Sequence, residues 1–421
     1  MRAWGRRGAF AALLVLPAFL MHGRGVAEVL VAVIDLLFLA DSVNTGDWRW
    51  LRAPWVRWAA AWWAWLVVCS LPFVGIGGWL SFGHALAVLR FLVLVAALES
   101  WLLRDGAARR WLGRVMTASA LYIGLQSLLQ LTIGRDVQGW RRSGDGSLTG
   151  PFEHARAAAP LSRLLFPALL PPVARLLRGR ALDRALAVAL SVVSVGTVVL
   201  IGQRMPLLLT ALGLLVSGLM LRRLRGVVVA ALAAGAIVLA ASAVLSPPTW
   251  AHLVVKFSAQ MSDFPASDYG RIGYRAWIIG VEHPLFGEGF AGYRNGCADP
   301  ATFIGWRGGN GLGASVCNIH PHNHYLEALT DSGFPGLMLF CGLIMAWLRG
   351  LLRGIGRDPD PLRVGLFVAA LIQEWPIASA SSFTAIEIGG FFFVLLGWGL
   401  AEARYGVSTS PIEPSPGRRS T

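Results

Sequence analysis

The chain has 421 residues, of which 55% are hydrophobic, and its mean hydropathy is +0.59. This composition excludes an ordinary soluble protein, because soluble domains are less hydrophobic. The formal net charge is +14, and Lys256 is the only lysine, so nearly all positive charge comes from arginine. A basic chain can bind nucleic acid, but these arginines lie in short segments between long apolar runs, which is typical of membrane proteins. We therefore expect membrane-spanning helices in contact with lipid, and no nucleic-acid partner.

Apolar runs long enough for membrane helices recur through the chain. A membrane helix needs about 20 apolar residues, with a range of roughly 17 to 25. The basic N-terminal segment could be a signal peptide, but no clear cleavage site follows it, so we interpret it as the first span. About twelve spans are predicted, at residues 8–23, 26–42, 56–74, 79–102, 111–132, 156–177, 183–202, 206–222, 226–246, 333–353, 362–380 and 383–403.

Arginines are concentrated in every second predicted loop, from Arg6 before the first span to Arg404 after the last. Such loops face the cytoplasm, so both termini are predicted to be cytoplasmic and the two long loops, one of them at 133–155, face outward. The predicted chain is all-α and multi-pass. It is divided into nine spans within 1–246, a large, partly helical outward loop at 247–332, three spans within 333–403 and a disordered cytoplasmic tail at 404–421.

Arg204 stands at a short predicted outer turn between two apolar spans, next to the polar Gln203. An arginine costs about 2.5–3.5 kcal/mol at the centre of a membrane helix and less near the interface. An anionic ligand would offset that cost, whereas the alternative is an arginine that only reaches the outer headgroups. Arg135, Arg141 and Arg142 add positive charge on the same side, which would attract an anionic substrate.

Residues 270–282 are predicted to form a helix that a following proline ends. Arg271 and Arg275 are four residues apart and share a face, and Tyr274 and Trp277 belong to an adjacent apolar-aromatic stripe. Two guanidinium groups on one face suit a phosphate or pyrophosphate, because each makes forked contacts to phosphate oxygens. The alternative is a surface helix with its aromatics at headgroup level and its arginines in contact with water or lipid headgroups.

Three of the eight histidines, His320, His322 and His324, fall within five residues. In an extended segment they would share a face and could bind zinc, but Pro321 disturbs such a segment. A helix that starts near Asn323 would make the three side chains diverge. Two other interpretations stay open: histidines that cap a loop as it re-enters the membrane, or one histidine that acts as a general base.

The four cysteines fall into two groups. Cys69 and Cys341 lie inside apolar spans, where we expect inert packing residues. Cys297 and Cys317 both lie in the large outward loop, twenty positions apart, and could form a disulfide in an oxidising compartment. Two free thiols or a metal-binding pair are the alternatives.

Three of these segments together resemble the O-antigen ligase/polymerase superfamily, and among its members most closely the O-antigen ligases of Gram-negative bacteria. The family combines about twelve spans and one large periplasmic loop with three short motifs. In this chain they are Gly202-Gln203-Arg204, "GRIGYRAWIIGVEHPLFGEG" from Gly270, and His322-Asn323 followed by "HYLEALTDSGFPG". The resemblance covers roughly 195–345 by motif and the whole chain by topology.

The resemblance implies a GT-C-like, metal-independent and inverting glycosyltransferase without a cofactor, in the bacterial inner membrane with its site facing the periplasm. Its donor would be O-antigen polysaccharide on undecaprenyl pyrophosphate. Its acceptor would be lipid A-core, and its product complete lipopolysaccharide. His322 would be the general base, and Arg204 and Arg271 would stabilise the pyrophosphate.

Six further residues would contact substrate: Arg275, Gln203, Asn323, His324, Tyr274 and Trp277. Arg275 departs from the family pattern, in which an aromatic residue is typical, so either Arg271 or Arg275 could make the main phosphate contact. The same donor would serve an O-antigen polymerase or a protein O-oligosaccharyltransferase. A hypothesis of another class is a transporter or flippase for lipid-linked sugars.

Overall fold

The structure is a computed structural model that describes residues 2–153, 157–297, 317, 320–378 and 383–406. All secondary structure in these ranges is helical, apart from one isolated bridge between Arg135 and Arg141. The prediction of an all-α fold is therefore confirmed for this part of the chain. Of the predicted disordered tail, residues 407–421 lie outside the described residues.

The helices follow the apolar runs of the sequence. Those ahead of the large loop are α1 (Arg2–His22), α2 (Arg24–Thr45), α3 (Pro54–Cys69), α4 (Gly78–Ala87), α5 (Leu89–Ala97), α6 (Gly106–Ile133), α7 (Ala158–Leu176), α8 (Ala181–Ile201), α9 (Arg204–Met220) and α10 (Arg225–Leu245). Those of the loop and beyond it are α11 (Pro247–Trp250), α12 (Lys256–Ser262), α13 (Asp268–Glu282), α14 (Gly292–Gly296), α17 (His324–Leu352), α18 (Pro361–Gln373) and α19 (Ile386–Tyr405). Short 3-10 or π turns are η1 (Arg49–Arg52), η2 (Leu98–Leu102), η3 (Arg222–Leu224), η4 (Ala251–Val255) and η5 (Phe264–Ala266).

Among the described residues, six helical segments are long and apolar enough to cross a membrane. They are Trp4–His22, Gly78–Leu102, Gly106–Ile133, Ala181–Ile201, Arg222–Leu245 and His324–Leu352. The chain is thus a multi-pass membrane protein. Each of the twelve predicted spans contains a helix, but several are short, as α3 with 16 residues and α18 with 13 are. The α2 helix carries acidic residues along its length, including a buried Asp35.

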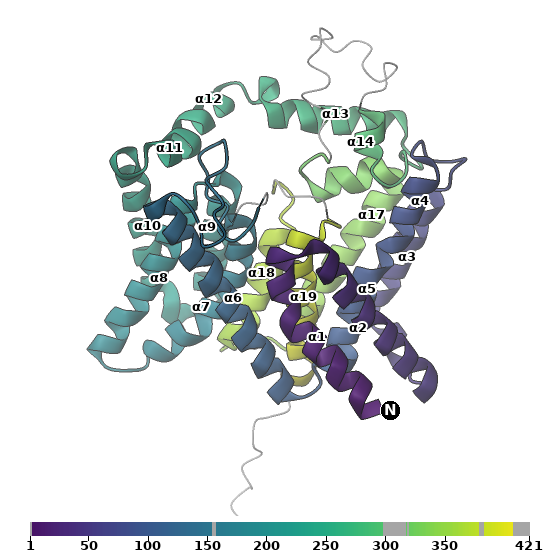
Figure 1. The fold of residues 1–421 in the computed structure, drawn as a ribbon, viewed down its shortest axis with the longest axis horizontal. Helices are drawn as coiled ribbons and strands as arrows, with labels where there is room; N and C mark the ends of the chain where they lie inside the picture. The colour runs from purple at the N-terminus through teal and green to yellow at the C-terminus, as the bar shows by residue number, and fades with distance from the viewer. Residues whose placement is uncertain (1, 154–156, 298–316, 318–319, 379–382, 407–421) are drawn as a thin grey trace, which may run out of the picture.

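Helices α11, α12 and α13 form an arch across one end of the helical bundle (Figure 1). The arch runs from the side of α8 and α10 to the side of α17 and α4, and we call this end of the molecule the loop end. The N-terminus lies at the opposite end (Figure 1). There Arg6 forms an ion pair with Asp105, and Arg404 with Glu99. The start of α1 and the finish of α19 therefore share the end opposite the arch.

A kink divides α17 at the point where the sequence predicts the large loop to end. Ser332 (φ −147°, ψ 16°) and Gly333 (φ 65°, ψ −170°) leave the helical conformation. A Cβ at Gly333 would lie 2.5 Å from the carbonyl oxygen of Leu285, so both the positive φ and the lack of space require glycine. Beyond the kink, the Phe334 N–H donates to the Pro284 carbonyl at 2.8 Å. The first turns of α17 are thus set apart from its long apolar part and packed against α13.

Candidate functional site

Arg204 begins α9 directly after a tight turn at the loop end. Gly202 in this turn has a φ of 84°, which a side chain would strain, and a Cβ there would lie 3.6 Å from the Thr249 side chain. The Arg204 guanidinium is half-buried and donates a hydrogen bond to the side-chain oxygen of Gln260 in α12. The turn thus delivers a cation to the loop end and ties it to the arch.

Other polar groups surround this turn. The side-chain oxygen of Gln203 is buried and has no hydrogen-bond partner among the described residues. Arg142, from the loop after α6, donates to the Ser246 hydroxyl at 3.4 Å, while Arg135 and Arg141 are exposed. Positive charge therefore gathers on this side of the molecule, as the sequence predicts.

The two arginines of α13 differ in burial and in their contacts. Arg275 is only 1% exposed, lies beside the buried Tyr293 and donates from Nη2 to the carbonyl oxygen of Cys297 at 2.9 Å. Arg271, one turn earlier, is half-buried and makes no side-chain hydrogen bond or ion pair with another residue in the described ranges. Arg275 therefore stabilises the loop from within, and Arg271 is the one that a ligand at the surface could reach.

The outer side of α13 carries the predicted stripe of apolar and aromatic residues. Tyr274, Trp277 and Val281 are each about half exposed, whereas Ile272, Ala276 and Ile279 are buried on the opposite side. Ser267 caps the helix, its hydroxyl accepting the Gly270 N–H at 3.2 Å. The helix therefore presents an aromatic surface to its surroundings beside Arg271.

Cys297 and Cys317 are joined in a disulfide, with their Cα atoms 5.4 Å apart. Cys297 is buried in a small apolar cluster with Ile272, Ala276 and Ile279 of α13. The bond therefore ties Cys317 to the buried side of α13. Cys69 and Cys341 are free thiols, as predicted.

Breaking this disulfide is expected to destabilise the loop end. Cross-linking residues 20 positions apart restricts the unfolded chain, and for a loop of this size the stabilisation is about 3 kcal/mol. We expect the double variant Cys297→Ala/Cys317→Ala to melt at a lower temperature than the wild type, and reductant to lower the melting temperature of the wild type but not that of the double variant. Cys341→Ala, which removes a free thiol, is the control. A wild-type protein that is insensitive to reductant would contradict a stabilising bond.

Asn323 fixes the start of α17. Its side-chain oxygen accepts the N–H groups of Tyr325 (3.0 Å) and Leu326 (3.1 Å), as an N-cap does. Its side-chain NH₂ donates to the carbonyl oxygens of Pro376 (2.7 Å) and Ala378 (3.4 Å). Both ends of this amide thus have structural partners, so Asn323 orients the residues around it.

His324 points into the protein. Its side chain and that of Glu374 are each 2% exposed, and Nδ1 lies 3.0 Å from the Glu374 Oε2. The ring also meets Phe383 edge-on, with 5.4 Å between centroids. The hydroxyl of the next residue, Tyr325, donates to the Glu374 carbonyl at 2.7 Å. His324 is therefore part of a buried polar cluster beneath the loop end.

His322 is the histidine of the three that lies between α13 and the start of α17. Its φ is 56°, a left-handed conformation that is uncommon for residues other than glycine and that recurs at functional sites. Its N–H donates to Nδ1 of His320 at 3.2 Å, and the two rings are 4.4 Å apart. Tyr269 of α13 contacts the ring of His322 edge-on, at 5.8 Å between centroids. His322 is half-buried, with a conformation set by its neighbours.

His320 is neutral at physiological pH. Burial lowers the pKa of its imidazole to about 3, and the nearby His322 and His324 add to this effect. A neutral Nδ1 is what allows His320 to accept the His322 N–H. The rings of His320 and His322 are inclined by 80°, and His324 is paired with Glu374. Among the described residues no three His, Cys, Asp or Glu side chains are placed to hold a metal ion.

Acidification is expected to loosen this segment. The folded pKa of His320, about 3, lies below the ordinary histidine value of 6.5, so the unfolded chain takes up a proton that the folded segment excludes. The stability that neutral His320 contributes is therefore present above about pH 6.5 and is lost as the pH falls toward 3. His320→Asn keeps an oxygen that can accept the His322 N–H but does not titrate. Between pH 7.5 and pH 5, the melting temperature should fall further for the wild type than for His320→Asn. An equal fall in both proteins would contradict this explanation.

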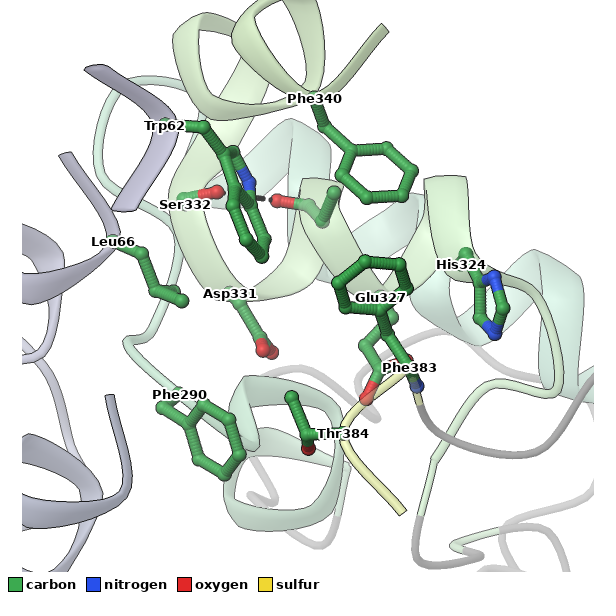
Figure 2. A pocket seen from close by; sticks show the side chains of 11 residues that line it. Trp62, Leu66, Phe290, His324, Glu327, Asp331, Ser332, Phe340, Phe383 and Thr384 are labelled. Atoms are coloured by element: carbon green, nitrogen blue, oxygen red, sulfur yellow. Dashed lines mark hydrogen bonds between the residues drawn. The ribbon is translucent and has the colours of Figure 1, made fainter. Parts of the chain in front are cut away.

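A small pocket lies between α3 and the first turns of α17, and His324 is one of the residues that line it (Figure 2). Two carboxylates on one face of α17, Glu327 and Asp331, line it together with aromatic side chains. Asp331 accepts the N–H groups of Gly292 (2.8 Å) and Ala291 (3.3 Å), and Glu327 accepts the Phe383 N–H at 3.2 Å. These carboxylates thus attach neighbouring loops to α17.

Sequence reasoning missed the three acidic residues next to the histidines: Glu327, Asp331 and Glu374. Glu327 and Asp331 lie in the first turns of α17, ahead of the predicted span at 333–353, and Glu374 lies inside the predicted span at 362–380. An acidic residue in or beside an apolar span is itself a signal, because burying it is costly without a partner. The signal was incomplete because the partner of Glu374 is His324, fifty residues earlier in the chain.

The arch connects the remaining candidates. Gln260 of α12 holds Arg204, and Tyr269 of α13 contacts His322, with Arg271 two residues further along. Helices α9 and α17 both pack against α18, which lies between them in Figure 1. The structure thus places Arg204, Arg271 and His322 at one end of the molecule, linked by one segment.

Residues 189–341 match the family model described as O-antigen ligase. The chain carries the O-antigen ligase family domain. The resemblance stated from the sequence is thereby confirmed, and the matched range contains Arg204, Arg271 and His322 as well as the whole arch. A comparison with curated proteins found no match to the sequence. The family domain supports a ligase- or polymerase-type membrane glycosyltransferase.

Proposed function

We propose that this protein transfers O-antigen polysaccharide from undecaprenyl pyrophosphate to lipid A-core, and so completes lipopolysaccharide. The observation that carries the proposal is the arch, which links the elements bearing Arg204, Arg271 and His322 within the range of the family match. We place this GT-C-like enzyme in the bacterial inner membrane, with the loop end in the periplasm and both termini in the cytoplasm. The shared position of the first and last helix ends, opposite the arch, supports that orientation.

The two accessible arginines suit a pyrophosphate leaving group. Negative charge grows on the pyrophosphate as its bond to the sugar breaks, and cations fixed beside it stabilise that charge without a metal or cofactor. The exposure of Arg271, against the burial of Arg275, supports Arg271 as the main phosphate contact on α13. Arg204 would meet the same group from the opposite side of the arch, with Gln203 next to it.

His322 would act as the general base. The acceptor hydroxyl gives its proton to the imidazole, its oxygen bonds to the anomeric carbon of the donor sugar, and the bond from that carbon to the phosphate oxygen breaks. Attack opposite the leaving group inverts the anomeric centre, and undecaprenyl pyrophosphate leaves. Tyr274 and Trp277 lie on the exposed side of α13 and would contact the lipid-linked donor. The structural contacts of Arg275, Asn323 and His324 support scaffolding roles for these three.

The lipopolysaccharide of a strain that lacks the gene tests this function. We expect bare core, accumulation of lipid-linked polymer, and restoration when the gene is returned. Core that carries a single repeat would indicate a polymerase, and unchanged lipopolysaccharide with loss of a protein-linked glycan would indicate a protein O-oligosaccharyltransferase. Donor trapped on the cytoplasmic side would indicate a flippase. Any of these three results would overturn the proposal.

A further inference from the structure

One short segment after α18, residues 374–378, holds the chain that follows His322. Asn323 donates to the carbonyl groups of Pro376 and Ala378, at 2.7 and 3.4 Å. Three consecutive residues, 323 to 325, are held in this way, since His324 and Tyr325 both bind Glu374, through its carboxylate and its carbonyl. We call residues 374–378 the clamp.

The clamp contains a buried charge with a buried partner. Arg163 of α7 is 6% exposed and lies near enough to Glu374 for a longer-range charge interaction, although the two side chains form no hydrogen bond or close ion pair. Nη1 of Arg163 and Oε1 of Glu374 are both buried without a hydrogen-bond partner in the described part of the chain. Burying such a pair with unsatisfied atoms is costly, and buried ionisable groups among membrane helices commonly mark a functional position. Glu374 and His324 connect the end of α18 to α17, and Arg163 lies in α7, which packs against α18.

His322 needs support from both sides to keep its backbone conformation. Its φ of 56° is disfavoured for a residue with a side chain. On the N-terminal side, His320 accepts the His322 N–H. On the C-terminal side, the support comes from residues 323–325, which the clamp holds. A shift of the clamp would therefore be transmitted directly to the imidazole of His322.

We propose that Glu374, with Arg163 as its buried counter-charge, is a positioning residue that holds His322 in its reactive orientation. The expected effect on kcat rests on the proposed function, whereas the expected effect on the conformation of the His322 segment does not. Glu374 itself is too deeply buried to touch a substrate at the surface, so it acts through His324, Tyr325 and the backbone around them. Removal of its charge should therefore affect turnover more than substrate binding.

Three variants distinguish whether Glu374 positions His322 or only balances the charge of Arg163. Glu374→Gln keeps the shape and removes the charge, and Arg163→Gln/Glu374→Gln removes both charges and so leaves no buried arginine unbalanced. Tyr325→Phe removes one contact to the clamp and no charge. We expect Glu374→Gln and the double variant to lower kcat of the purified protein about 10-fold with donor KM within twofold, and Tyr325→Phe to lower kcat about threefold. Wild-type kcat in the double variant would overturn the proposal, because Glu374 would then only balance Arg163.

Hydrogen exchange of the peptide that spans residues 320–328 gives a readout that needs no substrate. We expect faster exchange in this peptide for the double variant and for Tyr325→Phe, with the exchange of α5 unchanged. Exchange identical to wild type in both variants would overturn the proposal even if ligation were impaired. If the wild type shows no ligation, the proposed function fails, while the exchange data still decide whether the clamp holds the His322 segment. If Glu374→Gln alone cannot be purified, the other two variants carry the test.

Discussion

Replacing His322 by asparagine is expected to lower ligation by at least about 100-fold, because general-base catalysis contributes roughly 10²–10⁴-fold. Asparagine is the informative substitution here, since it tolerates the left-handed φ of 56° better than other residues and removes the imidazole alone. The measurement is the initial rate of polysaccharide transfer by purified protein, beside the melting temperature of each variant.

His84→Asn is the matched control. His84 lies in α4, is exposed and contacts Phe290, and it is not one of the residues assigned to substrate binding or catalysis. We expect this variant to transfer polysaccharide at a rate close to wild type. If His322→Asn also works within threefold of wild type, another group must take the acceptor proton and the base assignment is wrong.

Substitution of the two arginines of α13 is expected to have different effects, on kcat for Arg271 and on stability for Arg275. Arg271→Gln should lower kcat by about 10²–10³-fold, as the loss of one charge-stabilising donor typically does, with little change in stability. Arg275→Gln should lower stability instead, because its guanidinium is 1% exposed and bonds to the Cys297 carbonyl. Hydrogen bonds to charged groups contribute about 1.5–3 kcal/mol. Arg204→Gln should resemble Arg271→Gln.

Steady-state kinetics and thermal melting of the same preparations measure both effects. Because Arg271 and Arg275 lie four residues apart on one helix, each serves as the control for the other. A kcat defect in Arg275→Gln at full stability, with Arg271→Gln unaffected, would reverse the assignment of the main phosphate contact.

Local signals predicted much of the fold. Every predicted span contains a helix, because runs of apolar residues are the same signal that buries helices in a membrane. The helix that carries Arg271 was predicted from its spacing and the proline after it. A helix start near Asn323 was only one alternative for the histidine segment, and the structure has it there. Whether each helix is long and apolar enough to cross a membrane was less predictable. The acidic residues of α2 and the short length of α18 are tolerated only because neighbouring helices pack around them.

The candidate site was predicted less completely, and for a definite reason. Arg271 and Arg275 are equivalent by spacing, and only the packing of Tyr293 and the Cys297 carbonyl against one of them separates their roles. In the same way, Glu374 is assigned by contacts with Arg163 and His324, which are distant in the sequence. A single sequence carries periodicity but not the pairing of residues from different helices.

In vitro ligation tests the central claim most directly. Purified protein is mixed with undecaprenyl-pyrophosphate-linked polysaccharide and bare-core lipopolysaccharide, with and without EDTA, and the product is separated by size. We expect polysaccharide on lipid A-core in both conditions, released undecaprenyl pyrophosphate, and ligation at least about 100-fold slower with His322→Asn. Absence of product from the wild type, or activity lost in EDTA and restored by zinc, would contradict the proposed reaction or its metal-independent mechanism.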